Sequence, residues 1–250
     1  MNLAAALKAK YPSEVCDELL GAYREIEENF TIRKWKASEL DAGHFGEAAR
    51  RIVEYELFGS YSPIENSLNN FNDNELKRYE NSKGEESLRM LIPRALKAVY
   101  NIRNKRGVGH IGPISPNEMD ATFILYSVKW VLAEFVRLAC GTKAADTQKL
   151  IEAIIERRIG LLWKHEQIVR ILDSKISTRE QVLVLLFDLS PQTSAQLQQN
   201  TEYKNKSNLI KLLKRLHQDR LVVLTADGLV HLTPKGVPEA EKVMLLKQPS

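Results

Sequence analysis

Residues 88–110 read LRMLIPRALKAVYNIRNKRGVGH, and the apolar spacing in this stretch predicts how the surrounding chain folds. Apolar residues recur at intervals of three or one, which places them on one face of a helix. These residues are Leu88, Leu91, Ile92, Ala95, Leu96, Val99 and Ile102. Pro93 lies inside the stripe, so we expect the helix either to start near Pro93 or to be kinked there. The pattern predicts a helix packed on a core, with Arg103 and Asn104 on its flank.

The end of this helix is followed by Gly107-Val108-Gly109 and then by His110. Residues 101–116 contain three basic residues, one histidine and no acidic residue. An arginine can hold a phosphate oxygen, and a histidine titrates near neutral pH, so the pair suits chemistry on a phosphodiester. The alternative interpretation is structural. Cations are favoured in the last turn of a helix, Gly107 is a C-cap, and His110 is an ordinary loop residue.

The composition is that of an ordinary globular protein. The 250 residues are 44% apolar and 27% charged, with a net charge of +4, and they suit one large or two modest domains. Cys16 and Cys140 form neither a disulfide framework nor a metal-binding spacing, and they suit a reducing cytosol. Phe123–Leu138 is the most apolar stretch, but charged residues interrupt it. We expect a cytoplasmic protein with no membrane association, metal or other cofactor.

Two helices are predicted before residue 60. Apolar residues at helical spacing cover residues 12–30, and a second stripe runs from about 38 to 58, where Gly59 can end the helix. Gly43 and Gly46 leave the second helix slim. Because glycine has no side chain, another part of the chain can approach this helix closely.

Different segments lie on either side of residues 88–110. Residues 60–85 are rich in Asn, Ser, Asp and Gly, and they predict a long surface loop with one short helix at 73–80. After the loop that holds His110, Ser115-Pro116-Asn117-Glu118 reads as a capping box with Ser115 at the N-cap. The helix that follows should run to about residue 139. It is apolar nearly all round, so we expect it to be central or to lie in an oligomer interface.

The chain divides after this helix. We expect a helical domain at 1–141, a connector at 142–176 and a second domain at 177–250. Within the connector, residues 148–158 predict a helix, whereas residues 161–172 fit either a helix or a short hairpin.

The second domain begins at another capping box, Ser177-Thr178-Arg179-Glu180. Two more helices follow the first one. Apolar runs at 221–224 and 229–232 flank an Asp-Gly turn, which predicts a hairpin, and Thr233-Pro234 can start a last helix. The predicted order is therefore helix, helix, helix, hairpin, helix.

This order, the basic third helix KSNLIKLLKRLH and the ending LTPKG resemble winged-helix domains. In that family the third helix enters the major groove of DNA, and basic residues contact phosphates. The resemblance implies that DNA is contacted by Lys206, Asn208, Lys211, Lys214 and Arg215. Two alternatives remain: these residues form a solvated face, or the domain contacts protein.

The first 141 residues resemble the HEPN superfamily, whose all-α domains occur in bacterial toxins, abortive-infection proteins and RNA-targeting immune effectors. Six residues, beginning with Asn104, separate Arg103 from His110, as in the superfamily's motif. The segment AGHFGEAARRIVEY at 42–55 is similar to the abortive-infection branch. The glycines at 107 and 109 depart from members in which the helix continues through the motif.

The HEPN resemblance implies a homodimeric endoribonuclease that cuts RNA without a metal, acting as a toxin or phage-defence effector. A ribose 2′-hydroxyl would attack the adjacent phosphorus, leaving a 2′,3′-cyclic phosphate and a 5′-hydroxyl. His110 would be the general acid or base, and Arg103 would stabilise charge on the phosphoryl oxygens. Asn104 would orient the histidine or the phosphate, while Lys105 and Arg106 would contact RNA.

The implied dimer interface includes this motif and part of the helix at 116–139. His44 and Glu47 are weaker candidates for the same cleft, and their alternative interpretation is a surface pair at positions i and i+3. An antitoxin or another regulatory protein is a possible partner. The other function that the sequence supports is a DNA-binding transcriptional regulator, in which the helical domain only dimerises or binds a nucleotide-like ligand.

Overall fold

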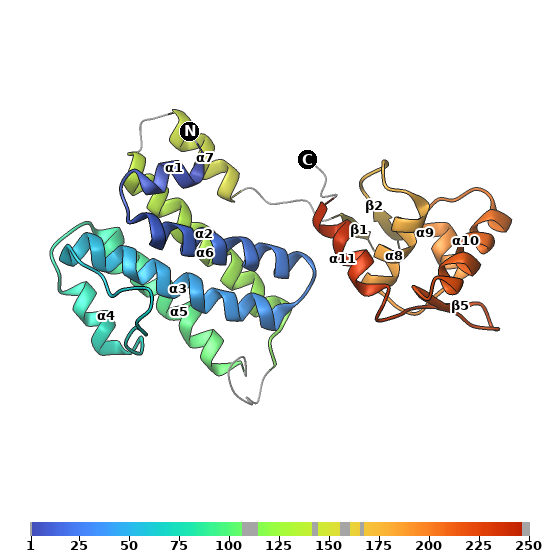
Figure 1. The fold of residues 1–250 in the computed structure, drawn as a ribbon, viewed down its shortest axis with the longest axis horizontal. Helices are drawn as coiled ribbons and strands as arrows, with labels where there is room; N and C mark the ends of the chain where they lie inside the picture. Colours follow the sequence, from blue (N-terminus) through green and yellow to red (C-terminus); the bar gives the residue numbers. More distant parts are fainter. Residues whose placement is uncertain (1, 107–114, 142–144, 156–160, 166–167, 247–250) are drawn as a thin grey trace. The chain divides into compact units, whose positions relative to one another are not determined.

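The computed structural model describes residues 2–106, 115–141, 145–155, 161–165 and 168–246. The described chain is mainly helical, with two small antiparallel sheets. It forms two compact units, Met1–Glu156 and Arg157–Ser250 (Figure 1). Among the described helices, none is both long and apolar enough to cross a membrane.

The first unit is a helical bundle in which α6 is central. Its elements are α1 (Leu3–Lys8), α2 (Ser13–Thr31), α3 (Trp35–Phe58), α4 (Asp73–Glu80), a π-helical turn (Ser87–Leu91), α5 (Ile92–Lys105), α6 (Glu118–Cys140) and α7 (Ala145–Ile155). Helices α2 and α3 pack side by side, and α6 contacts α1, α2, α3, α5 and α7 (Figure 1). The predicted helix after the motif is therefore central, because its apolar residues meet five neighbours.

Local sequence signals predicted several helix ends correctly. Gly59 ends α3 in the left-handed conformation, with φ of 70°, and its N–H bonds the carbonyl of Tyr55 at 3.0 Å. The short helix predicted at 73–80 is confirmed. Pro93 lies in the first turn of α5, which continues from the π-helical turn before it. A proline is tolerated there because the first N–H groups of a helix have no intrahelical partner.

The capping box predicted at Ser115 is wrong. Helix α6 begins at Glu118, and its N-cap is Asn117, whose Oδ1 accepts a hydrogen bond from the N–H of Asp120 at 3.0 Å. Asparagine is as good an N-cap as serine. Asn117, which directly precedes the first helical residue, therefore caps α6. The second predicted box is confirmed, because Ser177 and Glu180 cap α8 reciprocally.

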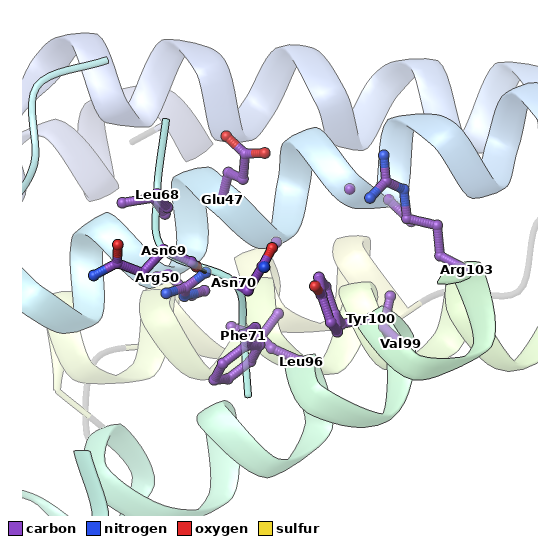
Figure 2. Close-up of a pocket in the computed structure, with 13 residues that line it drawn as sticks. Glu47, Arg50, Leu68, Asn69, Asn70, Phe71, Leu96, Val99, Tyr100 and Arg103 are labelled. Carbon is purple, nitrogen blue, oxygen red and sulfur yellow. Dashed lines mark hydrogen bonds between the residues drawn. The ribbon is translucent and has the colours of Figure 1, made fainter. Parts of the chain in front are cut away.

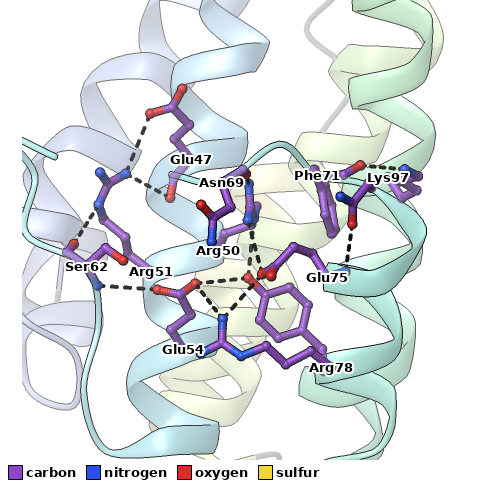
Figure 3. A network of polar contacts seen from close by, with 12 residues as sticks. Glu47, Arg50, Arg51, Glu54, Ser62, Asn69, Phe71, Glu75, Arg78 and Lys97 are labelled. Atoms are coloured by element: carbon purple, nitrogen blue, oxygen red, sulfur yellow. Dashed lines mark hydrogen bonds and ion pairs between the residues drawn. The ribbon is translucent and has the colours of Figure 1, made fainter. Parts of the chain in front are cut away.

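Two adjacent arginines of α3 hold the loop that follows this helix. Arg51 is 4% exposed and donates hydrogen bonds to four loop carbonyls, those of Ser62, Pro63, Ile64 and Asn66. Figure 3 shows the bond to Ser62. The guanidinium presents five N–H donors in a fixed fork, so one side chain can satisfy several carbonyls at once. The loop from Ser62 to Asn66 is thereby attached to α3, and Glu54 of the same helix adds a bond by accepting from the N–H of Ser62 at 3.3 Å.

Arg50 extends this attachment along the loop. It is 5% exposed and donates to the carbonyl of Asn69 at 3.0 Å and to the hydroxyl of Tyr79 at 3.3 Å (Figure 3). The Tyr79 hydroxyl in turn donates to Glu54 at 3.1 Å. Burial raises the pKa of Tyr79 to about 12, so it remains a hydrogen-bond donor at any physiological pH. The network positions residues 68–71 against α3.

The second unit is built on a three-stranded sheet and four helices. In chain order these are α8 (Thr178–Asp188), β3 (Gln192–Thr193), α9 (Ser194–Asn200), α10 (Lys206–Gln218), β4 (Val222–Leu224), β5 (Leu229–Leu232) and α11 (Val237–Leu246). The sheet order is β3-β5-β4, with both pairs antiparallel. The predicted order of three helices, a hairpin and a helix is confirmed, and β3 is the element that the sequence did not indicate.

The segment predicted as a connector, 142–176, is divided between the two units. Helix α7 packs on α6 in the first unit. Strands β1 (Leu162–His165) and β2 (Ile168–Ile171) form an antiparallel hairpin, which decides between the two structures that residues 161–172 allowed. Leu162, Val169 and Ile171 pack against the core of the second unit, and this burial explains why the strands belong to it.

Candidate functional site at the end of helix α5

Arg103 lies in the last turn of α5 with its side chain against α3. A Cβ atom placed on Gly43 would lie 2.9 Å from Arg103 Nε and 3.0 Å from its Cζ, so any larger residue at this position would have to displace the guanidinium. Val99, one helical turn earlier, is 3% exposed, and it directs this face of α5 toward the core. The glycines that make α3 slim therefore leave room for a side chain of α5. Within the described chain, they do not serve the close approach of another backbone.

The guanidinium of Arg103 makes no hydrogen bond or ion pair with any residue that the structure describes. Its Nε is buried, yet has no acceptor. A buried donor without a partner costs about 1–3 kcal/mol, and within the described residues nothing offsets this cost.

Arg103 stands at one end of a cavity of about 140 Å³ (Figure 2). The cavity lies between α3, the loop at 68–71 and α5. Its walls are formed by Ala42, Gly43, Gly46, Glu47, Arg50, Leu68, Asn69, Asn70, Phe71, Leu96, Val99, Tyr100 and Arg103. Arg50, which the sequence analysis did not single out, both lines the cavity and holds its loop wall in place.

Arg106, predicted to contact RNA, is engaged within the protein instead. Its Nε lies 2.7 Å from Oδ2 of Asp120, and its Nη2 donates to Oδ1 at 3.3 Å. Asp120 is only 4% exposed and also accepts from Asn117 at 2.6 Å. This cluster joins the end of α5 to the start of α6 across the loop between them.

Asn104 and Lys105 are exposed, and neither lines the cavity. Of the three neighbouring residues Arg103, Asn104 and Lys105, only Arg103 lines the described cavity. His110 lies outside the described residues, as do the glycines at 107 and 109. Of the predicted catalytic residues, Arg103 and Asn104 are described, and Arg103 is the one of these two that lines the cavity.

Glu39 is a buried carboxyl group near this cluster that the sequence analysis missed. It is fully buried, and neither of its oxygens has a hydrogen-bond partner within the described residues. Burial, with a smaller contribution from the negative charge of Asp120, raises its pKa to about 7. Its position three residues before Ala42 on the buried face of α3 is the signal that could have revealed it.

His44 and Glu47 face different neighbours. Glu47 lines the cavity, while His44 lies with Glu25 and Asp41, on the side of α3 that faces α2. One ligand atom from each of these last three residues lies within 4.8 Å of the other two, so they are the described residues that could hold a metal ion. Burial raises the pKa of Asp41, and the amide of Asn29 donates to it at 2.7 Å.

The solvent face of α6 is apolar over its first half. Met119, Phe123, Tyr126 and Trp130 are 71%, 46%, 44% and 40% exposed, at spacings of four, three and four residues. This spacing places all four on one stripe, which we call the α6 stripe. The stripe begins next to Asp120, the residue that Arg106 binds.

In the second unit, all five residues predicted to contact DNA lie on α10. Lys206, Asn208, Lys211, Lys214 and Arg215 are exposed, whereas Leu209, Leu213 and Leu216 are buried in the core of the unit. None of the four basic side chains forms an ion pair with a described residue. The helix therefore presents a continuous cationic face to solvent.

No family model, curated protein or solved structure matches this chain. The unpaired guanidinium, its cavity, the α6 stripe and the basic face of α10 are the features on which a function can be argued.

Proposed function

We propose that the first unit is a HEPN-type endoribonuclease domain that acts as a homodimer. The observation on which this proposal rests is that the buried Nε of Arg103 has no described hydrogen-bond acceptor. Arg50, Arg51 and Arg106 each bind acceptors of the protein, whereas Arg103 is held against Gly43 with no described acceptor. An arginine kept in this state, with six residues between it and a histidine, suits the binding of a phosphate oxygen.

The chemistry requires a proton acceptor, a proton donor and a cation at the scissile phosphate. The 2′-oxygen forms a bond to phosphorus, the bond from phosphorus to the 5′-oxygen breaks, and a 2′,3′-cyclic phosphate remains. A histidine takes the proton of the 2′-hydroxyl, and a second histidine gives a proton to the leaving 5′-oxygen. Arg103 stabilises the charge that develops on the non-bridging oxygens.

Two copies of the chain supply the second histidine. One His110 per protomer becomes two in a symmetric cleft if the interface passes near the motif. The α6 stripe supports this arrangement, since exposed aromatic residues at helical spacing are typical of protein interfaces. It begins at the Arg106–Asp120 pair, so a twofold axis that passes near the start of the stripe would bring the two motif ends toward each other.

The test is cleavage of a long single-stranded RNA in excess EDTA, with Arg103→Ala and His110→Ala beside the wild type. We expect both variants to lose activity by about 10²–10³-fold, and the products to carry 5′-hydroxyl ends. Lys83→Ala is the matched control, because Lys83 is exposed, does not line the cavity and has no predicted contact with RNA. Equal activity of wild type and both variants would reject the assignment.

Such an activity suits a cytoplasmic toxin or phage-defence effector, whose cleavage of cellular RNA arrests growth. Growth arrest on induction of the wild-type chain, absent for Arg103→Ala at equal protein level, is the expected result. Restoration of growth by a neighbouring gene would then identify a regulatory partner.

The second candidate function is DNA binding by a winged helix in the second unit. The observations that favour it are the basic face of α10 and the topology α8-β3-α9-α10-β4-β5 with the sheet order β3-β5-β4. In this proposal α10 enters the major groove, and the hairpin β4–β5 is the wing. If this is the main activity, the chain is a transcriptional regulator and the first unit serves dimerisation.

Duplex binding should weaken as salt concentration rises, and Lys211→Ala and Lys214→Ala should each lower both affinity and the salt slope. Lys175→Ala is a suitable control, since Lys175 is exposed and lies before α8. Binding that does not change in either α10 variant would count against this function.

A further inference from the structure

The cavity beside Arg103 has the size of a single six-membered ring. Its volume is about 140 Å³, and a cavity of about 150 Å³ engineered into another protein binds benzene. A ring of this size is found in a pyrimidine base, whereas a purine has a second, fused ring. The cavity therefore favours a small planar group over a large one.

The walls of the cavity offer a flat face and unused polar groups. The ring of Tyr100 is held edge to face against Phe71, with centroids 6.0 Å apart. Figure 2 shows the Asn70 side chain and the Tyr100 ring at the same hollow. Within the described chain, neither the Asn70 amide nor the Tyr100 hydroxyl makes a hydrogen bond. A base could stack on the ring and pair its edge with the amide.

Three charged residues line the cavity, and only Arg103 has no described acceptor. Arg103 of α5 packs against Gly43 of α3, and Glu47 lies four residues further along α3, 3.7 Å from Arg51. Arg50 donates to Asn69 and Tyr79 and lies 3.8 Å from Glu75, so its charge is already engaged within the protein. A phosphate is attracted to the Arg103 end and repelled by the carboxylate of Glu47. A nucleotide would therefore place its phosphate at Arg103 and its base deeper, between Tyr100 and Asn70.

We propose that this cavity receives a pyrimidine base of the RNA, from a nucleotide that adjoins the phosphate bound by Arg103. The proposal rests on the ribonuclease function proposed above and adds a sequence preference to it. Base selection comes from the width of the cavity, from stacking on Tyr100 and from the amide of Asn70. The Arg50 and Arg51 network maintains the selection by fixing the loop that carries Asn70.

Gly46→Leu is the sharpest variant for testing the cavity. Gly46 lines the cavity, and a Cβ at this position meets nothing within 4 Å, so the leucine enters the empty space without disturbing α3. Gly21→Leu is the matched control, because Gly21 is also helical and its added Cβ meets nothing within 4 Å, but it lies on α2 away from the cavity. Asn70→Ala removes the side-chain amide. Tyr100→Phe removes the hydroxyl but keeps the ring on which a base would stack.

The measurement is the sequencing of 5′-hydroxyl ends after cleavage of a random-sequence RNA by the full-length chain. For the wild type we expect at least about a tenfold preference for pyrimidine over purine at one nucleotide adjoining the cut, the lower range of pocket discrimination. Gly46→Leu and Asn70→Ala should reduce this preference to about twofold or less, while Gly21→Leu and Tyr100→Phe retain it. Wild-type cleavage without a base preference, or a preference unchanged in Gly46→Leu, overturns the proposal and leaves the ribonuclease function standing.

A second measurement separates the cavity from the catalysis. In an NMR titration with uridine 3′-monophosphate, we expect the side-chain amide signal of Asn70 to shift in the wild type but not in Gly46→Leu. This shift without any RNA cleavage would overturn the ribonuclease function and retain the cavity as a pyrimidine nucleotide site. Absence of both the shift and the cleavage overturns both proposals.

Discussion

Arg51 on α3 and Arg103 on α5 are both partly or fully buried arginines of the same bundle, yet their surroundings are opposite. Arg51 gives its donors to four loop carbonyls, whereas Arg103 rests on Gly43 with a buried Nε that has no described acceptor. Burying a charged group is costly unless it is hydrogen-bonded. The difference shows that Arg51 holds the fold together, and it supports the proposal that Arg103 binds a ligand.

The largest effect should be on folding stability at Arg51. Arg51→Ala leaves four part-buried loop carbonyls without this donor, so we expect a loss of about 3 kcal/mol in the free energy of unfolding. Arg103→Ala should change it by less than about 0.5 kcal/mol, because it removes no described hydrogen bond. Urea denaturation followed by circular dichroism measures both. Similar losses of unfolding free energy in the two variants would show that the two arginines contribute equally to stability.

The next effect concerns pH and the cluster beside Arg106. The folded-state pKa of Glu39, about 7, lies above its ordinary value of 4.5, so its stabilising contribution is complete below pH 4.5 and is lost as pH rises through about 7. Glu39→Gln cannot ionise, so above pH 7 it should be more stable than wild type by an amount on the order of 2–3 kcal/mol. Thermal unfolding at pH 5 and pH 8 measures this. A stability difference that does not change with pH would contradict the assignment.

A smaller effect is expected where the two helices meet. Gly43→Ala places a Cβ 2.9 Å from Arg103 Nε and must displace the guanidinium. We expect RNA cleavage to fall about tenfold, consistent with the sensitivity of catalysis to small misplacements. Gly46→Ala provides the control, because its Cβ meets nothing within 4 Å. Equal cleavage rates in the two variants would show that the position of Arg103 on α3 is unimportant.

The smallest effect should come from the cap of α6. Asn117→Ala removes the hydrogen bond to the N–H of Asp120 and the contact of the Asn117 amide with its carboxylate. We expect a loss of about 1 kcal/mol in unfolding free energy, the usual cost of an N-cap. Ser115→Ala should leave stability unchanged within about 0.5 kcal/mol, since Ser115 is exposed and does not cap the helix. A larger loss of unfolding free energy for Ser115→Ala than for Asn117→Ala would show that Ser115 caps the helix, as its sequence pattern suggested.

Several features were predictable from the sequence because their causes are local. The apolar stripe from Leu88 to Ile102 and the stop at Gly59 depend on residues within a few positions of each other. The same is true of the capping box at Ser177 and of the hairpin around Asp227-Gly228. The choice between Ser115 and Asn117 was missed because both are good caps, and the sequence did not show which residue lies nearest the first helical turn.

The sequence by itself determined the helices, the hairpin of the second unit and the position of Arg103 near a helix end. Only the tertiary structure placed Arg103 on Gly43, sixty residues earlier in the chain, and enclosed the cavity with a loop held by Arg50 and Arg51. It also buried Glu39 beside the Asp120–Arg106 pair. The physical reason is that helical periodicity and capping act over one or two turns. Which side chains meet between helices depends instead on how closely their backbones approach and on which polar groups remain unpaired.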